Sequence, residues 1–194
     1  MRNSPVILLL TVLGRWAKYA PLTAFAVLIL SGVFGDLVVR DVVRSVGDVA
    51  GTDELVLRAV GWAWMGGPLV VMTALFAVRR RLGPVVKAVL TYVMSTVAAS
   101  SAMLLGHRGD GGPERRFGEA YLVARPVSFG WASAVGALIL TFLLGLVTLA
   151  IVGKVAGRPL SKDGQVRLGW GLGGLWIVLL GVSLWFGLTG PLPN

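Results

Sequence analysis

Apolar residues are concentrated in five long stretches of the chain, separated by short segments that carry the charges. Four of the stretches hold 18 to 25 residues, enough for a helix to cross roughly 30 Å of hydrocarbon. The first is shorter, but helical patterning continues on both sides of it. None of the five contains Asp, Glu, Lys, Arg or His. The stretches are residues 22–35, 60–77, 89–106, 129–153 and 168–190.

This pattern predicts an all-α integral membrane protein, because a helix satisfies its own backbone hydrogen bonds in lipid. We expect a single membrane domain over residues 1–194, built as a five-transmembrane-helix bundle. Extending each stretch by its flanking helical pattern places the spans at about 20–46, 53–80, 86–106, 127–153 and 166–189.

The N-terminal residues predict an interfacial helix over residues 3–18. Val6 and Leu13 fall on one apolar side, and Arg15 and Lys18 flank it. A cleavable signal peptide is not expected, because these two cations stand where a small-residue cleavage site would follow the apolar run.

Charged residues at helical spacing extend the first predicted helix beyond its apolar stretch. Asp36, Arg40 and Arg44 recur every four residues, and Asp48 follows Arg44 at the same spacing. Opposite charges four residues apart stabilise a helix by roughly 0.2–0.5 kcal/mol per pair. We expect this helix to continue to about residue 46 and to end at Gly47.

The second predicted helix begins with Thr52 as its N-cap, and Glu54 and Arg58 stand four residues apart within it. The first two helices therefore form a hairpin whose charged tip stands outside the bilayer. This tip is a candidate docking surface for a protein partner, formed by Asp36, Arg40, Arg44, Glu54 and Arg58.

A second charged segment lies between the third and fourth spans, at residues 107–126. Pro113 follows two glycines and suits the first position of a short surface helix, and Pro126 is expected to end the segment. Arginine binds phosphate bidentately, so a lipid or polyprenyl-phosphate head group is a plausible guest here. A solvated loop with internal ion pairs is the plainer interpretation. The candidate lipid- or phosphate-binding residues are His107, Arg108, Arg115, Arg116 and Arg125.

The cations are distributed unequally between the two sides of the predicted bundle. The N-terminus, the second connection and the fourth connection together carry a net charge of +10, and the remaining segments carry −1. Cytoplasmic segments are the ones enriched in Lys and Arg, so we expect a multi-pass protein of a bacterial inner (plasma) membrane. The N-terminus is then cytoplasmic and the C-terminus extracytoplasmic.

Composition excludes several kinds of chemistry. The chain is 56% hydrophobic and 14% charged, whereas soluble domains carry about 25% charged residues. It has no cysteine and one histidine, so disulfides, iron–sulfur clusters and other thiol-ligated metals are excluded, and we expect no cofactor and no metal site. Uncharged spans argue against a proton relay or an intramembrane protease. The basic residues lie next to the spans, so nucleic-acid binding is not expected.

Small and hydroxyl-bearing residues supply the remaining candidates. Ala132 with Gly136, and Gly169 with Gly173, have the small-xxx-small spacing of helix contacts in membranes. A hydroxyl-rich strip on the third span could line a path for a small solute, although such residues also serve helix packing. The strip holds Thr91, Ser95, Thr96 and Ser100.

No catalytic constellation emerges, and three functional hypotheses remain open. The favoured one is a non-enzymatic accessory or structural subunit of a larger membrane complex. The second is a small oligomeric channel or transporter for an uncharged or anionic solute, and the third is an outer-face protein that binds or modifies a lipid. Expected partners are membrane lipids and either other membrane subunits or further copies of the chain.

Overall fold

The computed structural model describes residues 19–78, 81–104, 114, 117–156 and 162–192, and the regular structure in these ranges is entirely helical. The predicted interfacial helix at 3–18 lies outside the described residues. The elements are α2 (Ala20–Ala50), α3 (Glu54–Val78), α4 (Pro84–Ser100), the 3-10 turns η2 (Ser101–Leu104) and η3 (Gly118–Ala120), α6 (Tyr121–Ala156) and α7 (Lys162–Thr189).

Within the described ranges, four segments are long and apolar enough to cross a membrane: Glu54–Val78, Pro84–Leu104, Gly118–Val152 and Arg167–Thr189. They correspond to the second through fifth predicted spans. The first predicted span contributes only a shorter apolar helical segment, Pro21–Ser31, within α2. The all-helical bundle is therefore confirmed, whereas the count of five spans is not.

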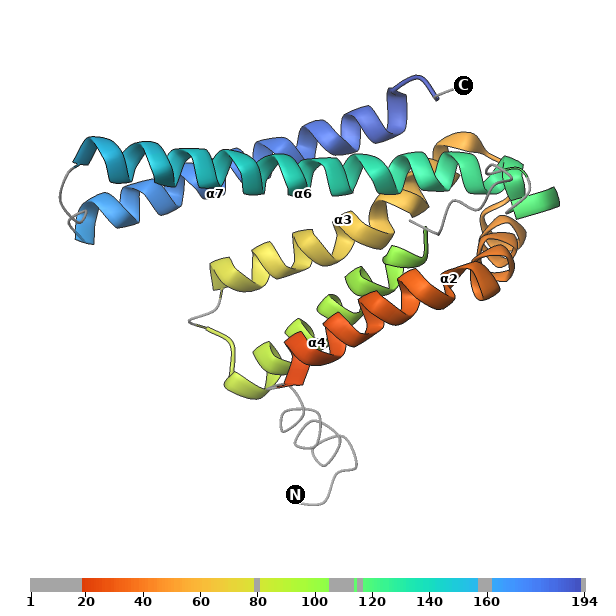
Figure 1. Ribbon diagram of the computed structural model, residues 1–194, viewed down its shortest axis with the longest axis horizontal. Coiled ribbons are helices and arrows are strands. Elements are labelled where there is room, and N and C mark those ends of the chain that lie inside the picture. Colours follow the sequence, from red (N-terminus) through yellow and green to blue (C-terminus); the bar gives the residue numbers. More distant parts are fainter. Residues whose placement is uncertain (1–18, 79–80, 105–113, 115–116, 157–161, 193–194) are drawn as a thin grey trace, which may run out of the picture.

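The helices form two groups that diverge from a common end (Figure 1). One group is the antiparallel pair α6 and α7, and α2 packs against α4 in the other. Helix α3 lies between them and packs along α6. We call the end where the groups meet the α2–α3 end; it holds the turn at residues 51–53, η2, η3 and the last residues of α7.

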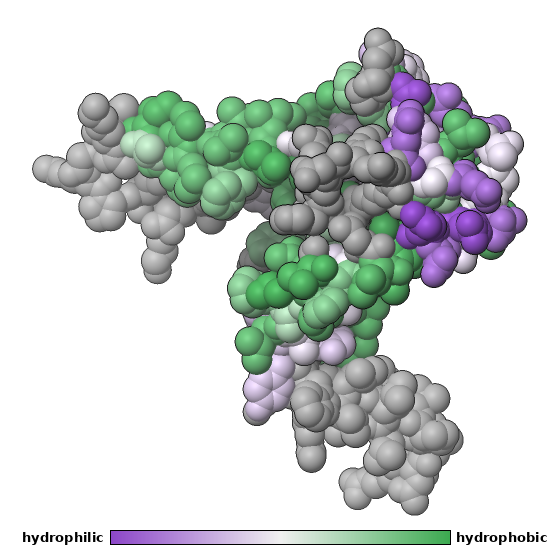
Figure 2. Space-filling model, turned by 45° about the vertical axis from the view of Figure 1, so that its right-hand side comes forward, coloured by the Kyte–Doolittle hydropathy of each residue, from purple (hydrophilic) through white to green (hydrophobic). Residues whose placement is uncertain are grey.

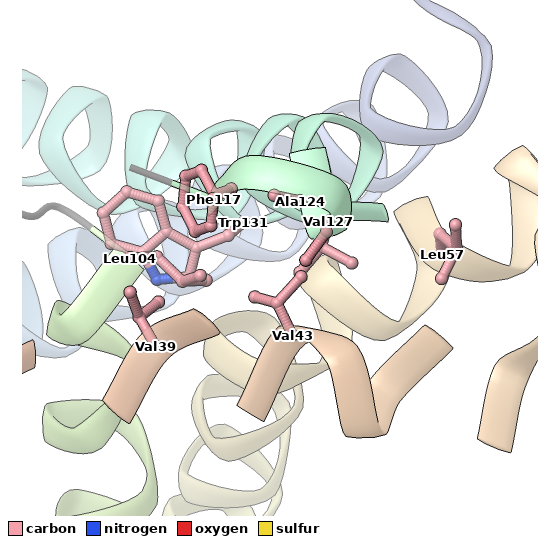
Figure 3. Close-up of a cluster of buried hydrophobic side chains, with 9 residues drawn as sticks. Val39, Val43, Leu57, Leu104, Phe117, Ala124, Val127 and Trp131 are labelled. Atoms are coloured by element: carbon pink, nitrogen blue, oxygen red, sulfur yellow. The ribbon is translucent and has the colours of Figure 1, made fainter. Parts of the chain in front are cut away.

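Most of the buried apolar side chains lie at the α2–α3 end. Val39 and Val43 of α2 point toward Trp131 and Val127 of α6 and toward Leu104 of η2 (Figure 3). Phe117 completes this cluster from the segment before α6. Since α2, α3, η2, η3 and α6 all contribute, this cluster fixes the C-terminal half of α2 against the rest of the fold.

Two glycines let α3 and α6 approach to backbone contact. A Cβ added to Gly61 would collide with the carbonyl oxygen of Val127, and one added to Gly130 would collide with the carbonyl oxygen of Arg58. Both glycines are buried. Close approach of this kind is how helices associate in lipid, where water exclusion does not drive packing.

The boundaries of α2 and α3 differ from the predicted ones. Helix α2 continues past Gly47 to Ala50 and ends at Gly51, which has the positive φ of 76° that favours glycine. Asp53, not Thr52, caps α3, because its Oδ1 accepts hydrogen bonds from the backbone N–H groups of Leu55 (2.8 Å) and Val56 (3.1 Å).

Pro126 does not end a segment before the fourth span, as we expected. Helix α6 begins at Tyr121 and runs through this proline. Pro126 is the sixth residue of α6, so the helix continues through it without the backbone hydrogen bond that an N–H at this position would donate one turn back.

The predicted small-residue pairs make few contacts within the chain. A Cβ added to Gly136, Gly169 or Gly173 would meet nothing within 4 Å. The close approaches occur at other glycines, among them Gly35, Gly61, Gly130 and Gly187.

Candidate functional site

A buried arginine at the α2–α3 end joins α3 to the end of α7. Arg58 is 5% exposed, and its Nη1 donates hydrogen bonds to the carbonyl oxygens of Leu188 (3.2 Å) and Gly190 (2.6 Å). These carbonyls lie at the C-terminus of α7, where the helix dipole places partial negative charge. The guanidinium therefore caps α7 from a different helix.

Two further groups neutralise and cover the Arg58 charge. Its Nη2 donates to Oε1 of Glu54, one turn earlier on α3, as the sequence spacing predicted. The ring of Phe129 lies with its centroid 5.0 Å from the Arg58 Cζ, in the range of a cation–π contact. Both terminal nitrogens of Arg58 are therefore hydrogen-bonded, whereas its Nε is buried without a hydrogen-bond partner among the described residues.

A second ion pair joins α2 to the segment before α6. Arg44 Nη2 lies 4.0 Å from Glu119 Oε2, and both side chains are exposed. The sequence pattern had paired Arg44 with Asp48 on the same helix, but the arginine reaches across to η3 instead. Such an exposed pair stabilises a fold by at most about 1 kcal/mol.

The five predicted docking residues divide into two environments. Arg40 and Arg44 are exposed on α2, and the Arg40 guanidinium lies beside Gly118. Glu54 is half-exposed at the start of α3, whereas Arg58 lies inside the protein. The side chain of Asp36 falls outside the described residues. Arg58 therefore acts within the fold, and only the other described residues face outward.

The hydroxyl-rich strip of α4 takes part in helix contacts at its end near η2. Ser100 Oγ accepts a 3.3 Å hydrogen bond from the indole of Trp64, and Ser101 Oγ accepts one of 2.9 Å from Trp131. Thr96 Oγ1 bonds its own helix at the carbonyl of Tyr92, while Thr91 is exposed and Ser95 half-buried. The described contacts use these hydroxyls mainly for packing.

Of the predicted phosphate-binding residues, the structure describes only Arg125, which is half-buried in the first turns of α6. His107, Arg108, Arg115 and Arg116 lie outside the described residues. Figure 2 shows that hydrophilic side chains gather at the α2–α3 end, while apolar side chains cover both helix groups.

Sequence inspection missed the tryptophan–hydroxyl pairs. Besides the pairs at Ser100 of α4 and Ser101 of η2, Trp62 donates to Ser183 (3.0 Å) and Trp176 to Thr73 (2.7 Å). Trp62 and Trp131 are 8% and 7% exposed and lie inside the bundle. The abundance of serine and threonine beside seven tryptophans was the available signal.

No protein-family model matches the chain, and no curated protein or solved structure is similar enough to match it. The class of protein is therefore defined by its fold and its described contacts alone. The chain belongs to the helical proteins with several helices of membrane-spanning length and composition. At the α2–α3 end they are joined by a polar cluster, which consists of Glu54, Arg58 and the carbonyl groups of Leu188 and Gly190.

Proposed function

We propose that this chain is a non-enzymatic accessory or structural subunit of a larger complex in a bacterial inner membrane. In this proposal α2 is a fifth span, the N-terminus is cytoplasmic and the α2–α3 end is extracytoplasmic. Helix α2 holds 31 residues and is therefore about 46 Å long, so it can cross the hydrocarbon and still extend beyond it.

The observation that carries the proposal is the glycine-rich surface of α7. Gly169 and Gly173 are exposed, and a Cβ on either would meet nothing within 4 Å. Glycine weakens a helix interior by about 0.5–1 kcal/mol relative to alanine, and small residues are characteristic of helix–helix interfaces in membranes. A stripe of this kind that faces away from its own bundle favours a helix from another chain.

The polar cluster supports a structural role. Its buried arginine is occupied by Glu54, Phe129 and the end of α7, so it is committed to holding helices together. The channel hypothesis draws no support from α4, because Ser100 is bonded to Trp64. We therefore rest the proposal on assembly and not on transport.

Purification from native membranes in a gentle detergent tests the proposal. We expect a stoichiometric second protein to remain with the chain. A pure single-chain protein, or a homo-oligomer with no second protein, would contradict it.

A further inference from the structure

An apolar groove lies on the part of α2 near the α2–α3 end. Its volume is about 480 Å³, and its lining residues are Asp41, Val42, Ser45, Val46, Val49 and Ala50 of α2, with Val60 of α3. Val49 is 90% exposed. The groove is thus a valine-rich surface on the same helix as several charges.

Under the proposed function, on which this inference rests, the groove lies beyond the hydrocarbon. About 20 residues of helix cross the apolar layer, so residues after about 40 project from it. The charges at Asp41, Arg44 and Asp48 agree with that placement. Exposed valines outside the lipid tails indicate a surface that another molecule covers.

The apolar positions have the spacing of a helix-pairing seam. Val38, Val42, Ser45 and Val49 recur at i, i+4, i+7 and i+11, which places them on one side of α2. Ser45 donates its hydroxyl proton to the carbonyl oxygen of Asp41 (2.9 Å), so this polar residue needs no partner within the seam. A second helix laid along α2 would bury these side chains.

One edge of this seam is acidic. Asp41 and Asp48 are seven residues apart on α2, both are exposed, and neither forms an ion pair within the part of the chain that the structure describes. Arg44 is directed to Glu119 instead. A second copy of α2 laid parallel and in register would bring aspartate against aspartate, and an anionic lipid head group would meet the same repulsion.

We infer that the groove binds an amphipathic helix of a partner subunit, with apolar side chains at heptad spacing and Lys or Arg residues along the edge that meets Asp41 and Asp48. The valines supply the buried surface. The two carboxylates select the partner and its register, because rim charges govern specificity more than affinity.

Photo-crosslinking in native membranes tests the inference. The crosslinking residue is placed at Val49 in the groove, and a control is placed at Leu122, which is 80% exposed at the start of α6 and does not line the groove. We expect Val49 to crosslink to one partner, and the crosslinked peptide to have apolar residues at heptad spacing flanked by cations. Leu122 is expected not to crosslink to that peptide.

Charge reversal supplies the second readout. The double variant Asp41→Lys, Asp48→Lys should lower the Val49 crosslink about fivefold or more at unchanged expression, and Glu119→Lys should not. The inference is overturned if Val49 crosslinks only to lipid, to a second copy or to an uncharged or acidic segment, or if charge reversal has no effect. Should the purified complex persist in those cases, the groove inference fails and the proposed function stands; if no complex exists, both fail.

Discussion

Nη1 of Arg58 donates a 2.6 Å hydrogen bond to the carbonyl oxygen of Gly190, which lies 132 positions later in the chain. This contact joins the start of α3 to the end of α7. Beside it, Gly130 brings the backbone of α6 against α3 at Arg58 itself. Three helices are thus fixed at one point, and the predictions below follow from that geometry.

Replacing the buried arginine should loosen α7. Arg58→Met removes the hydrogen bonds to Leu188 and Gly190, and hydrogen bonds from a charged donor contribute about 1.5–3 kcal/mol each. We expect a lower midpoint of thermal unfolding in detergent, measured by size-exclusion chromatography after heating. Arg44→Met is the control, because its exposed pair with Glu119 should change the stability by less than about 1 kcal/mol. Equal effects of the two substitutions would contradict the central role of Arg58.

The α3–α6 crossing should tolerate no side chain at its glycines. Gly61→Ala forces a methyl group against the carbonyl oxygen of Val127, and backbone cannot yield as a flexible side chain does. We expect Gly61→Ala to lower the free energy of unfolding by about 3 kcal/mol or more, which would be seen as a low yield of folded protein. Gly67→Ala, on the same helix with open space around it, should fold normally. A normal yield of Gly61→Ala would mean that the helices do not cross this closely.

The hydrogen bond between Trp131 and Ser101 is expected to couple the two residues energetically. A double-mutant cycle with Trp131→Phe and Ser101→Ala should give a coupling free energy of about 0.6 kcal/mol and at most about 1.7 kcal/mol, the mean and the maximum for hydrogen-bonded pairs within a membrane bundle. A second cycle, of Trp131→Phe with Ser133→Ala, is the comparison. Among the described contacts Ser133 bonds only the carbonyl oxygen of Gly130, so we expect no coupling between it and Trp131. Zero coupling between Trp131 and Ser101 would show that this serine has another role.

The orientation proposed for the chain can be tested without removing any native thiol, since the sequence has no cysteine. A single cysteine at Asp48 should react with a membrane-impermeant reagent added outside intact cells. One at Lys162 should react only after the membrane is opened. The reverse labelling pattern would invert the topology and place the α2–α3 end in the cytoplasm.

Helix positions were predictable from the sequence because apolar length and charge placement determine them directly. The Glu54–Arg58 pair was also predictable, since both residues share one helix and four residues separate them. The contacts between helices were not. Gly61 and Gly130 have no distinctive spacing relative to each other, and Arg44 could satisfy either Asp48 on its own helix or Glu119 elsewhere. Long-range partners depend on which helix faces meet, and periodicity alone does not specify that.

The most direct test of the central claim is the native mass of the complex, solubilised gently from its own membrane, for the wild type and for Gly173→Ile. Val182→Ile, an exposed residue on the opposite side of α7, serves as the matched control. We predict that the 20.4 kDa chain occurs with a stoichiometric partner in the wild type and in the control, and that the glycine variant loses it. A wild-type protein found only as a single chain or as copies of itself would contradict the account.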